Sequence, residues 1–263
     1  SWIPLIIKWH FLLKNSEVDI PLTKSIAVWF AGISFEITPG HVGVLMKSQI
    51  LKTSFNISRT KTVPIIIVEK AYELIGAILA SVIGIIILGM EFYLIIIAIS
   101  GLIVIFFFMY HKPASELFFN RITKLKFFSK YVENISEFYE IVKKSTNVKV
   151  ATICILLALT YWFMVSAAAY YTLIAFDVNI LDYLKVLAIY TTSSLLGAIS
   201  FIPGGIGVTE GSITGLFTLN GIDVSTALIL SVMIRIFTLW YSVGVGFIAL
   251  KFTGAFSSRK NFS

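Results

Sequence analysis

The stretch Phe201-Ile202-Pro203-Gly204-Gly205-Ile206-Gly207-Val208-Thr209-Glu210-Gly211 interrupts a long apolar region in the C-terminal half of the chain. Pro203 lacks an amide donor, and three glycines within five residues let the backbone turn. The apolar flanks are typical of membrane helices, so we expect this loop at membrane depth. Irregular backbone is tolerated there only where it is buried in protein or lines a polar cavity. The stretch therefore predicts a binding element of a membrane transporter.

The composition also indicates an integral membrane protein. Of 263 residues, 57% are hydrophobic and 13% are charged, and the mean hydropathy is +0.91. Soluble domains carry about 25% charged residues. Several apolar stretches approach or exceed the roughly 20 residues that span a bilayer. We predict an all-α, polytopic, multi-pass protein of the cell membrane. The net charge of +7 fits anchoring at the cytoplasmic side, and no basic soluble face suggests a nucleic-acid partner.

We expect one transmembrane domain over residues 1–263. Because the chain starts at Ser1 within an apolar segment, we expect further residues before it in the natural protein. Cys154 is the only cysteine, which excludes an intrachain disulfide and a cysteine metal cluster. The sequence shows no metal-ligand cluster and no catalytic triad spacing, so we expect no metal, no cofactor and no catalytic residue.

Hydrophobic runs divide the chain into helices and connections. Pro64 is expected in the first turn of its helix, where proline is tolerated. The expected helical segments are 2–13, 25–37, a short helix ending near 52, 63–89, 92–110, 149–175, 184–202, 206–219 and 224–250.

The segment 112–148 mixes basic and aromatic residues. This pattern suggests helices lying on an anionic membrane surface. A solvated helical hairpin with a small core of its own is the alternative. The basic connections 52–62 and 112–149 and the C-terminal tail are expected in the cytoplasm, because positive residues favour that side.

Two loops suggest an internal repeat. Ile37-Thr38-Pro39-Gly40-His41-Val42-Gly43-Val44 shares its Pro, Gly, Gly and Val spacing with residues 201–208. Three crossings separate the two loops, so the helix hairpins that contain them would enter from opposite faces. We expect inverted repeats at about 14–89 and 176–250, each with a broken or re-entrant hairpin, as in many secondary transporters. Two ordinary kinked helices with close glycine packing are the alternative.

Such a site could bind an anion. Helix N-termini at Gly40–Gly43 and Gly204–Gly207 expose amides and a partial positive charge, which suits a phosphate headgroup. Arg235 lies near the middle of the last span, and intramembrane charges are functional candidates. The predicted substrate-binding residues are Pro39, Gly40, Gly43, Lys47, Glu69, Glu73, Pro203, Gly204, Gly205, Gly207, Glu210 and Arg235.

The buried charges also have a structural interpretation. Arg235 would then pair with Glu73 or Glu69 to neutralise both groups. Lys47 and Lys70 would extend to an interface. A carboxylate at Glu210 is favoured in the first turn of a helix.

At these residues the chain resembles the lysylphosphatidylglycerol synthase transmembrane-region family, which includes the flippase domain of bacterial multiple peptide resistance factors. The resembling pieces are Pro203 to Glu210, Pro39-Gly40-xx-Gly43-xxx-Lys47, Val68-Glu69-Lys70-xx-Glu73-xx-Gly76 and Arg235. Lys70 and Glu73 stand where the family usually has Arg and Asp. The resemblance covers nearly the whole chain and implies translocation of a charged lipid between leaflets.

The expected function is a flippase-like transporter for an anionic phospholipid or a polyprenyl-phosphate-linked lipid. A membrane-embedded transferase or hydrolase would need an acid or base, for which Glu210 and His41 are the candidates. An accessory protein that anchors a glycosyltransferase or synthase is the third possibility. The partners expected are the lipid itself and either a second copy of the chain or such an enzyme.

Overall fold

A computed structural model describes residues 1–38, 43–87, 92–111, 113 and 135–253. This part of the chain is helical and holds no strand, which confirms the all-α prediction. The longer helices are α1 (Ile3–Asn15), α2 (Leu22–Ile33), α3 (Met46–Phe55), α4 (Arg59–Ile87), α5 (Phe92–Tyr110), α8 (Ile135–Ser145), α9 (Val148–Ala175), α10 (Tyr183–Ile199), α11 (Val208–Leu219), α12 (Val224–Arg235) and α13 (Tyr241–Leu250). Short helical turns are η2 (Pro203–Gly205), η3 (Ile236–Trp240) and η4 (Lys251–Thr253).

Two of the described helices are long and apolar enough to cross a bilayer, Val148–Ala175 and the continuous rod Val224–Leu250. The second rod is not uniform, because η3 is a π-helical segment that begins directly after Arg235. π-helical turns inside α-helices occur frequently at functional sites. The sequence predicts one regular span here and gives no sign of this change in winding.

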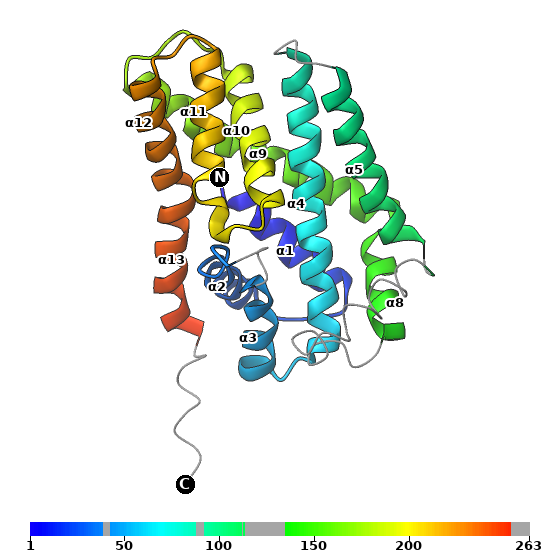
Figure 1. The fold of residues 1–263 in the computed structure, drawn as a ribbon. Helices are drawn as coiled ribbons and strands as arrows, with labels where there is room; N and C mark the ends of the chain where they lie inside the picture. The colour runs from blue at the N-terminus through cyan, green and yellow to red at the C-terminus, as the bar shows by residue number, and fades with distance from the viewer. Residues whose placement is uncertain (39–42, 88–91, 112, 114–134, 254–263) are drawn as a thin grey trace.

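Helices α10 and α11 pack side by side, and η2 connects them at mid-height of the molecule (Figure 1). Helices α2 and α3 lie in the other half of the same view, with the rod α12–α13 along one edge. In α2–α3 and in α10–α11 a helix is followed by a shorter one, as the sequence predicts.

Two hydrophobic cores share the long helix α9. The first contains α1 to α4 and the start of α9, including Trp9, Tyr72 and Cys154. The second contains the end of α9 with α10, α11 and α12, including Ala169 and Phe217. Because α9 contributes to both cores, it fixes the two halves of the bundle against each other.

Helix α4 starts earlier than the sequence predicts. It begins at Arg59, so Pro64 lies inside the helix rather than in its first turn. The hydroxyl of Ser58 accepts a hydrogen bond from the Thr60 amide at 3.2 Å. This local bond satisfies one of the first free amides and lets the helix start before the apolar run.

The basic segment 112–148 is described only at residue 113 and from residue 135 onward. In α8, Phe138, Ile141 and Val142 are buried in the first core, and Lys143 and Lys144 are exposed. The Tyr72 hydroxyl donates to the Ser145 carbonyl at 2.8 Å. The apolar face of α8 is therefore covered by protein and the two lysines are exposed, so the position of this helix at a membrane surface stays a prediction.

Candidate functional site

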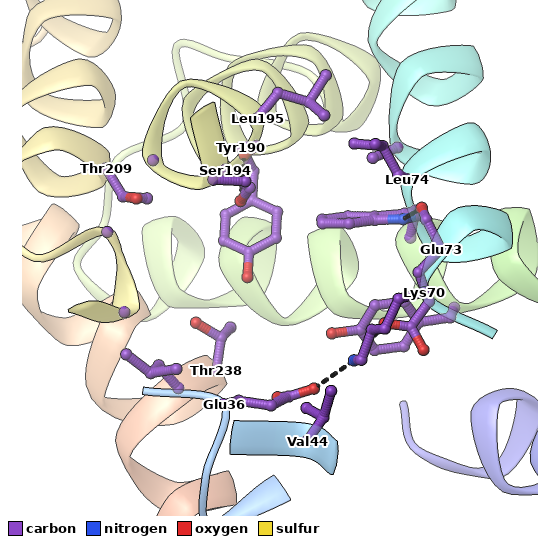
Figure 2. A pocket seen from close by; sticks show the side chains of 18 of the residues that line it. Glu36, Val44, Lys70, Glu73, Leu74, Tyr190, Ser194, Leu195, Thr209 and Thr238 are labelled. Atoms are coloured by element: carbon purple, nitrogen blue, oxygen red, sulfur yellow. Dashed lines mark hydrogen bonds and ion pairs between the residues drawn. The ribbon is translucent and has the colours of Figure 1, made fainter. Parts of the chain in front are cut away.

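A cavity of about 470 Å³ lies where the two cores meet (Figure 2). Its walls come from α4, α9, α10, η2, α11, α12 and η3 and from the turns between α2 and α3. The lining includes apolar residues such as Ile66, Leu74 and Leu195. The charged residues that line it are Glu36, Lys70, Glu73 and Arg235. A mainly apolar cavity with a few convergent charged groups is typical of a ligand site.

The α10–α11 break forms one edge of this cavity. Gly204 and Gly205 adopt φ values of 61° and 63°, which favour glycine. A Cβ atom on Gly205 would lie 2.7 Å from the Thr209 hydroxyl oxygen. A Cβ atom on Gly204 would lie 3.3 Å from Ile37 and 3.4 Å from Leu239. A side chain at Gly204 would therefore meet Ile37, just before the first loop, as well as the π-helical segment.

Arg235 is held at this break by two bonds. Its Nε donates to Glu210 Oε1 at 2.8 Å, and its Nη2 donates to the Gly204 carbonyl. The other oxygen of Glu210 accepts the Gly207 amide at 2.7 Å. A carboxylate thus already covers one amide at the N-terminus of α11. Arg235, whose side chain is 9% exposed, presents its charge to the cavity.

The opposite wall carries a chain of ion pairs that starts at Lys70. Its ammonium group donates to Glu36 at 2.7 Å and to Glu73 at 2.6 Å (Figure 2). Glu73 also accepts from Lys8 at 3.0 Å, and Lys8 donates to the Glu69 carbonyl at 3.1 Å. The Lys8 side chain is fully buried. These contacts tie α1 and the turn after α2 to α4.

Lys47 and Glu69 form a separate buried ion pair. The Lys47 ammonium group also lies 4.4 Å from the centre of the Trp9 ring. A Cβ atom on Gly32 would lie 2.4 Å from Lys47 Cγ, so only glycine leaves room for this side chain. The pair is behind the cavity wall and fixes α3 against α4.

Aromatic side chains complete the wall near Glu73. The Trp162 indole donates to the Glu73 carbonyl at 3.0 Å, and its ring lies 6.3 Å from that of Tyr190. Tyr161, Trp162 and Tyr190 all line the cavity, and the Tyr190 ring points into it (Figure 2).

The structure brings four of the predicted site residues to this cavity: Glu73, Gly204, Gly205 and Arg235. Glu210 lies behind Arg235, and Lys47 and Glu69 lie in their own pair. Gly43 donates its amide to the Thr38 hydroxyl at 2.7 Å. Pro203 and Gly207 belong to the break without lining the cavity. Pro39, Gly40 and His41 lie outside the described residues.

Two structural interpretations from the sequence are wrong. Arg235 pairs with Glu210, whereas Glu69 and Glu73 pair with lysines, because α4 turns both glutamates toward α1 and α3. Lys47 does not extend to an interface, since it is only 2% exposed. Lys70 points to two carboxylates at the cavity and does not extend away from it.

Sequence reasoning missed the contributions of Lys8, Glu36 and the aromatic wall. Lys8 is a lone cation in the apolar run 2–13. A charge in such a run was the signal that could have marked Lys8 as a candidate. Glu36 follows α2 directly. Among the described residues, no group of three potential metal ligands is present.

Comparison with known proteins agrees with this picture of a membrane protein. A family model described as "Lysylphosphatidylglycerol synthase TM region" matches residues 2–246. A curated relative, the UPF0104 membrane protein PH1989 of Pyrococcus horikoshii, is 23% identical over 271 residues, covering 91% of this chain and 80% of that protein. No solved structure matches. The chain therefore belongs to the lysylphosphatidylglycerol synthase transmembrane-region family of membrane proteins.

Proposed function

We propose that this protein is a multi-pass transporter of the cell membrane that moves a phosphate-bearing lipid between leaflets. The proposed substrate is an anionic phospholipid or a polyprenyl-phosphate-linked lipid. The observation that carries the proposal is the cavity, in which Arg235 and Gly204 at one helix break face Lys70 and Glu73 across apolar walls. A lipid needs both features, because its headgroup is polar and its chains are not.

In this proposal Arg235 binds the phosphate. A guanidinium group has five N–H donors in a fixed fork that suits phosphate oxygens. Two of them donate to Glu210 and to the Gly204 carbonyl, and these two acceptors orient the guanidinium group toward the cavity. The remaining donors are free to bind a ligand. Membership of a family named for a lipid synthase supports a role with lipids.

We further propose that α2–α3 and α10–α11 are re-entrant hairpins of two inverted repeats, entering from opposite faces. A Cβ atom on Gly204 would lie 3.3 Å from Ile37, and this supports the arrangement because Ile37 directly precedes the first loop in the sequence. The basic connections and the C-terminus would face the cytoplasm. Alternating access would then expose the cavity to each leaflet in turn.

The test is lipid translocation in proteoliposomes that contain the purified protein and tail-labelled phospholipids. We expect Arg235→Ala to lower the rate at least about tenfold, because an interaction of about 1.4 kcal/mol already corresponds to a factor of ten. The matched control is Lys251→Ala, which removes an exposed cation outside the cavity. Equal rates for the wild-type protein and Arg235→Ala would refute the site. Labelled lipid converted to a new product, without translocation, would instead support a transferase.

A further inference from the structure

The charged groups at the cavity cancel one another. Among the described residues the lining contains two cations, Lys70 and Arg235, and two carboxylates, Glu36 and Glu73. The groups bonded directly behind them, Lys8 and Glu210, add one charge of each sign. The Lys47–Glu69 pair is also balanced.

This balance constrains the ligand. Each cation at the cavity already has a carboxylate partner within 3.0 Å. A phosphate with one negative charge would leave the site with an uncompensated charge, and such a charge is costly in an environment of low dielectric constant. A headgroup that brings its own positive charge avoids this cost.

The two ends of the cavity suit the two halves of such a headgroup. Thr209 and Thr238 lie on one side of Tyr190 and the Lys70–Glu73 pair lies on the other (Figure 2). Arg235 donates to the Gly204 carbonyl at the break that also holds Thr209, so this end can bind a phosphate.

The side of the cavity near Lys70, toward which the Glu36 carboxylate reaches (Figure 2), can bind an ammonium group. Glu36 uses Oε1 for Lys70, and its side chain keeps an exposed fraction of 24%. The rings of Trp162, Tyr161 and Tyr190 line the same cavity. Carboxylates and aromatic faces are the groups that attract an organic cation.

We propose that the headgroup is zwitterionic, with one phosphate at Arg235 and one ammonium group at Glu36, Glu73 and the aromatic wall. This inference rests on the proposed lipid transport, and within it a phosphate-bearing lipid without net charge replaces the anionic phospholipid as the substrate. Glu36 then determines specificity, because removing its charge leaves the cavity with one excess positive charge.

The experiment compares tail-labelled phosphatidylethanolamine, which has no net charge, with phosphatidylglycerol, which has one negative charge, in proteoliposomes at pH 7.5. We expect the wild-type protein to translocate phosphatidylethanolamine at least about tenfold faster. Glu36→Gln should reverse or remove this preference, shifting the ratio of the two rates at least about tenfold. Glu17→Gln, an exposed carboxylate that pairs with Lys144, is the matched control and should leave the ratio unchanged.

Each other outcome has a defined meaning. Translocation of phosphatidylglycerol at an equal or higher rate, with no shift in Glu36→Gln, overturns the zwitterion proposal and leaves lipid transport standing. If phosphatidylglycerol reaches the rate of phosphatidylethanolamine only at pH 5.5, a proton supplies the missing positive charge, which supports the requirement for a headgroup without net charge. Translocation of neither lipid refutes phospholipid transport and, with it, this inference.

A second variant keeps the test valid if Glu36→Gln does not fold. Lys70→Gln makes the cavity more negative, so it should increase the preference for phosphatidylethanolamine at least about tenfold. An unchanged or reduced preference in a folded Lys70→Gln protein overturns the inference.

Discussion

Glu210 joins Arg235 to the start of α11: Oε1 accepts the guanidinium Nε–H at 2.8 Å, and Oε2 accepts the Gly207 amide at 2.7 Å. One carboxylate therefore performs two tasks. It balances a charge near the cavity, and it satisfies an amide that the helix leaves free. The position of Arg235 thus depends on the helix break, although 25 residues separate the two partners.

Removing either partner of this pair should destabilise the protein. Arg235→Gln leaves a carboxylate and Glu210→Gln leaves a guanidinium without its counter-ion, and each should cost about 3 kcal/mol. In the double variant neither charge remains, so its loss should be smaller than the sum by about 1–3 kcal/mol. Thermal unfolding of the four proteins in detergent measures this coupling. Additive losses would show that the two groups do not interact.

Lys8 should matter for stability more than an exposed lysine does. Lys8→Met removes a fully buried cation and leaves Glu73 with Lys70 alone, which should cost about 3 kcal/mol. The matched control is Lys144→Met, because the Lys144–Glu17 pair is exposed and such pairs contribute little. Melting temperatures measured side by side provide the comparison. Equal shifts for both variants would contradict the buried network.

Gly205 and Gly215 should respond in opposite ways to the same substitution. Gly205→Ala forces a side chain into a left-handed backbone conformation, which costs about 1–2 kcal/mol, and adds contact with Thr209. Gly215 lies inside α11, where a new Cβ atom has open space around it. Gly215→Ala should therefore stabilise the protein by about 0.5–1 kcal/mol. Melting temperatures should therefore fall for the first variant and rise for the second. A rise for Gly205→Ala would contradict the described turn.

The exposed Glu17–Lys144 pair predicts a small pH effect. The hydrogen bond from Lys144 lowers the pKa of Glu17 below its ordinary value of 4.5. The contribution of this carboxylate to stability is therefore present above pH 4.5 and is lost as the pH falls through the lowered pKa. The same bond raises the pKa of Lys144, so the contribution of this cation is fully present below pH 10.5 and is lost as the pH rises through the raised pKa.

Carbon NMR titration of labelled glutamate checks this prediction. In Lys144→Met the pKa of Glu17 should return toward 4.5, because the hydrogen-bond donor is gone. An unchanged pKa of Glu17 in this variant would show that the pair does not form in solution.

The sequence predicted the helices well because the signal for each is local. Long apolar runs set the bounds of α9 to within about two residues, and the Pro-Gly-Gly turn after α10 follows from backbone chemistry. The start of α4 was missed because the hydroxyl of Ser58, rather than hydropathy, determines it. The π-helical turn after Arg235 was missed because its residues resemble any other apolar helix.

The pairing of charges could not be predicted in the same way. Lys8 and Glu73 are separated by 65 residues, and nothing in a run of apolar residues tells which distant carboxylate a lysine will meet. Several pairings satisfy the same net charge, and the sequence left Arg235 with a choice of Glu69 or Glu73. The packing of α1 and α3 against α4 decided which cations Glu69 and Glu73 meet.

For this protein the sequence alone determined the class, because hydropathy over about 20 residues decides whether a helix suits a bilayer. It also determined where the break between α10 and α11 occurs, since proline and glycine act on their own backbone. The tertiary structure alone decided which charges pair and that Arg235, Gly204, Lys70 and Glu73 share one cavity. The reason is physical: burial and ion pairing depend on distances between segments, and these exist only once the helices have packed.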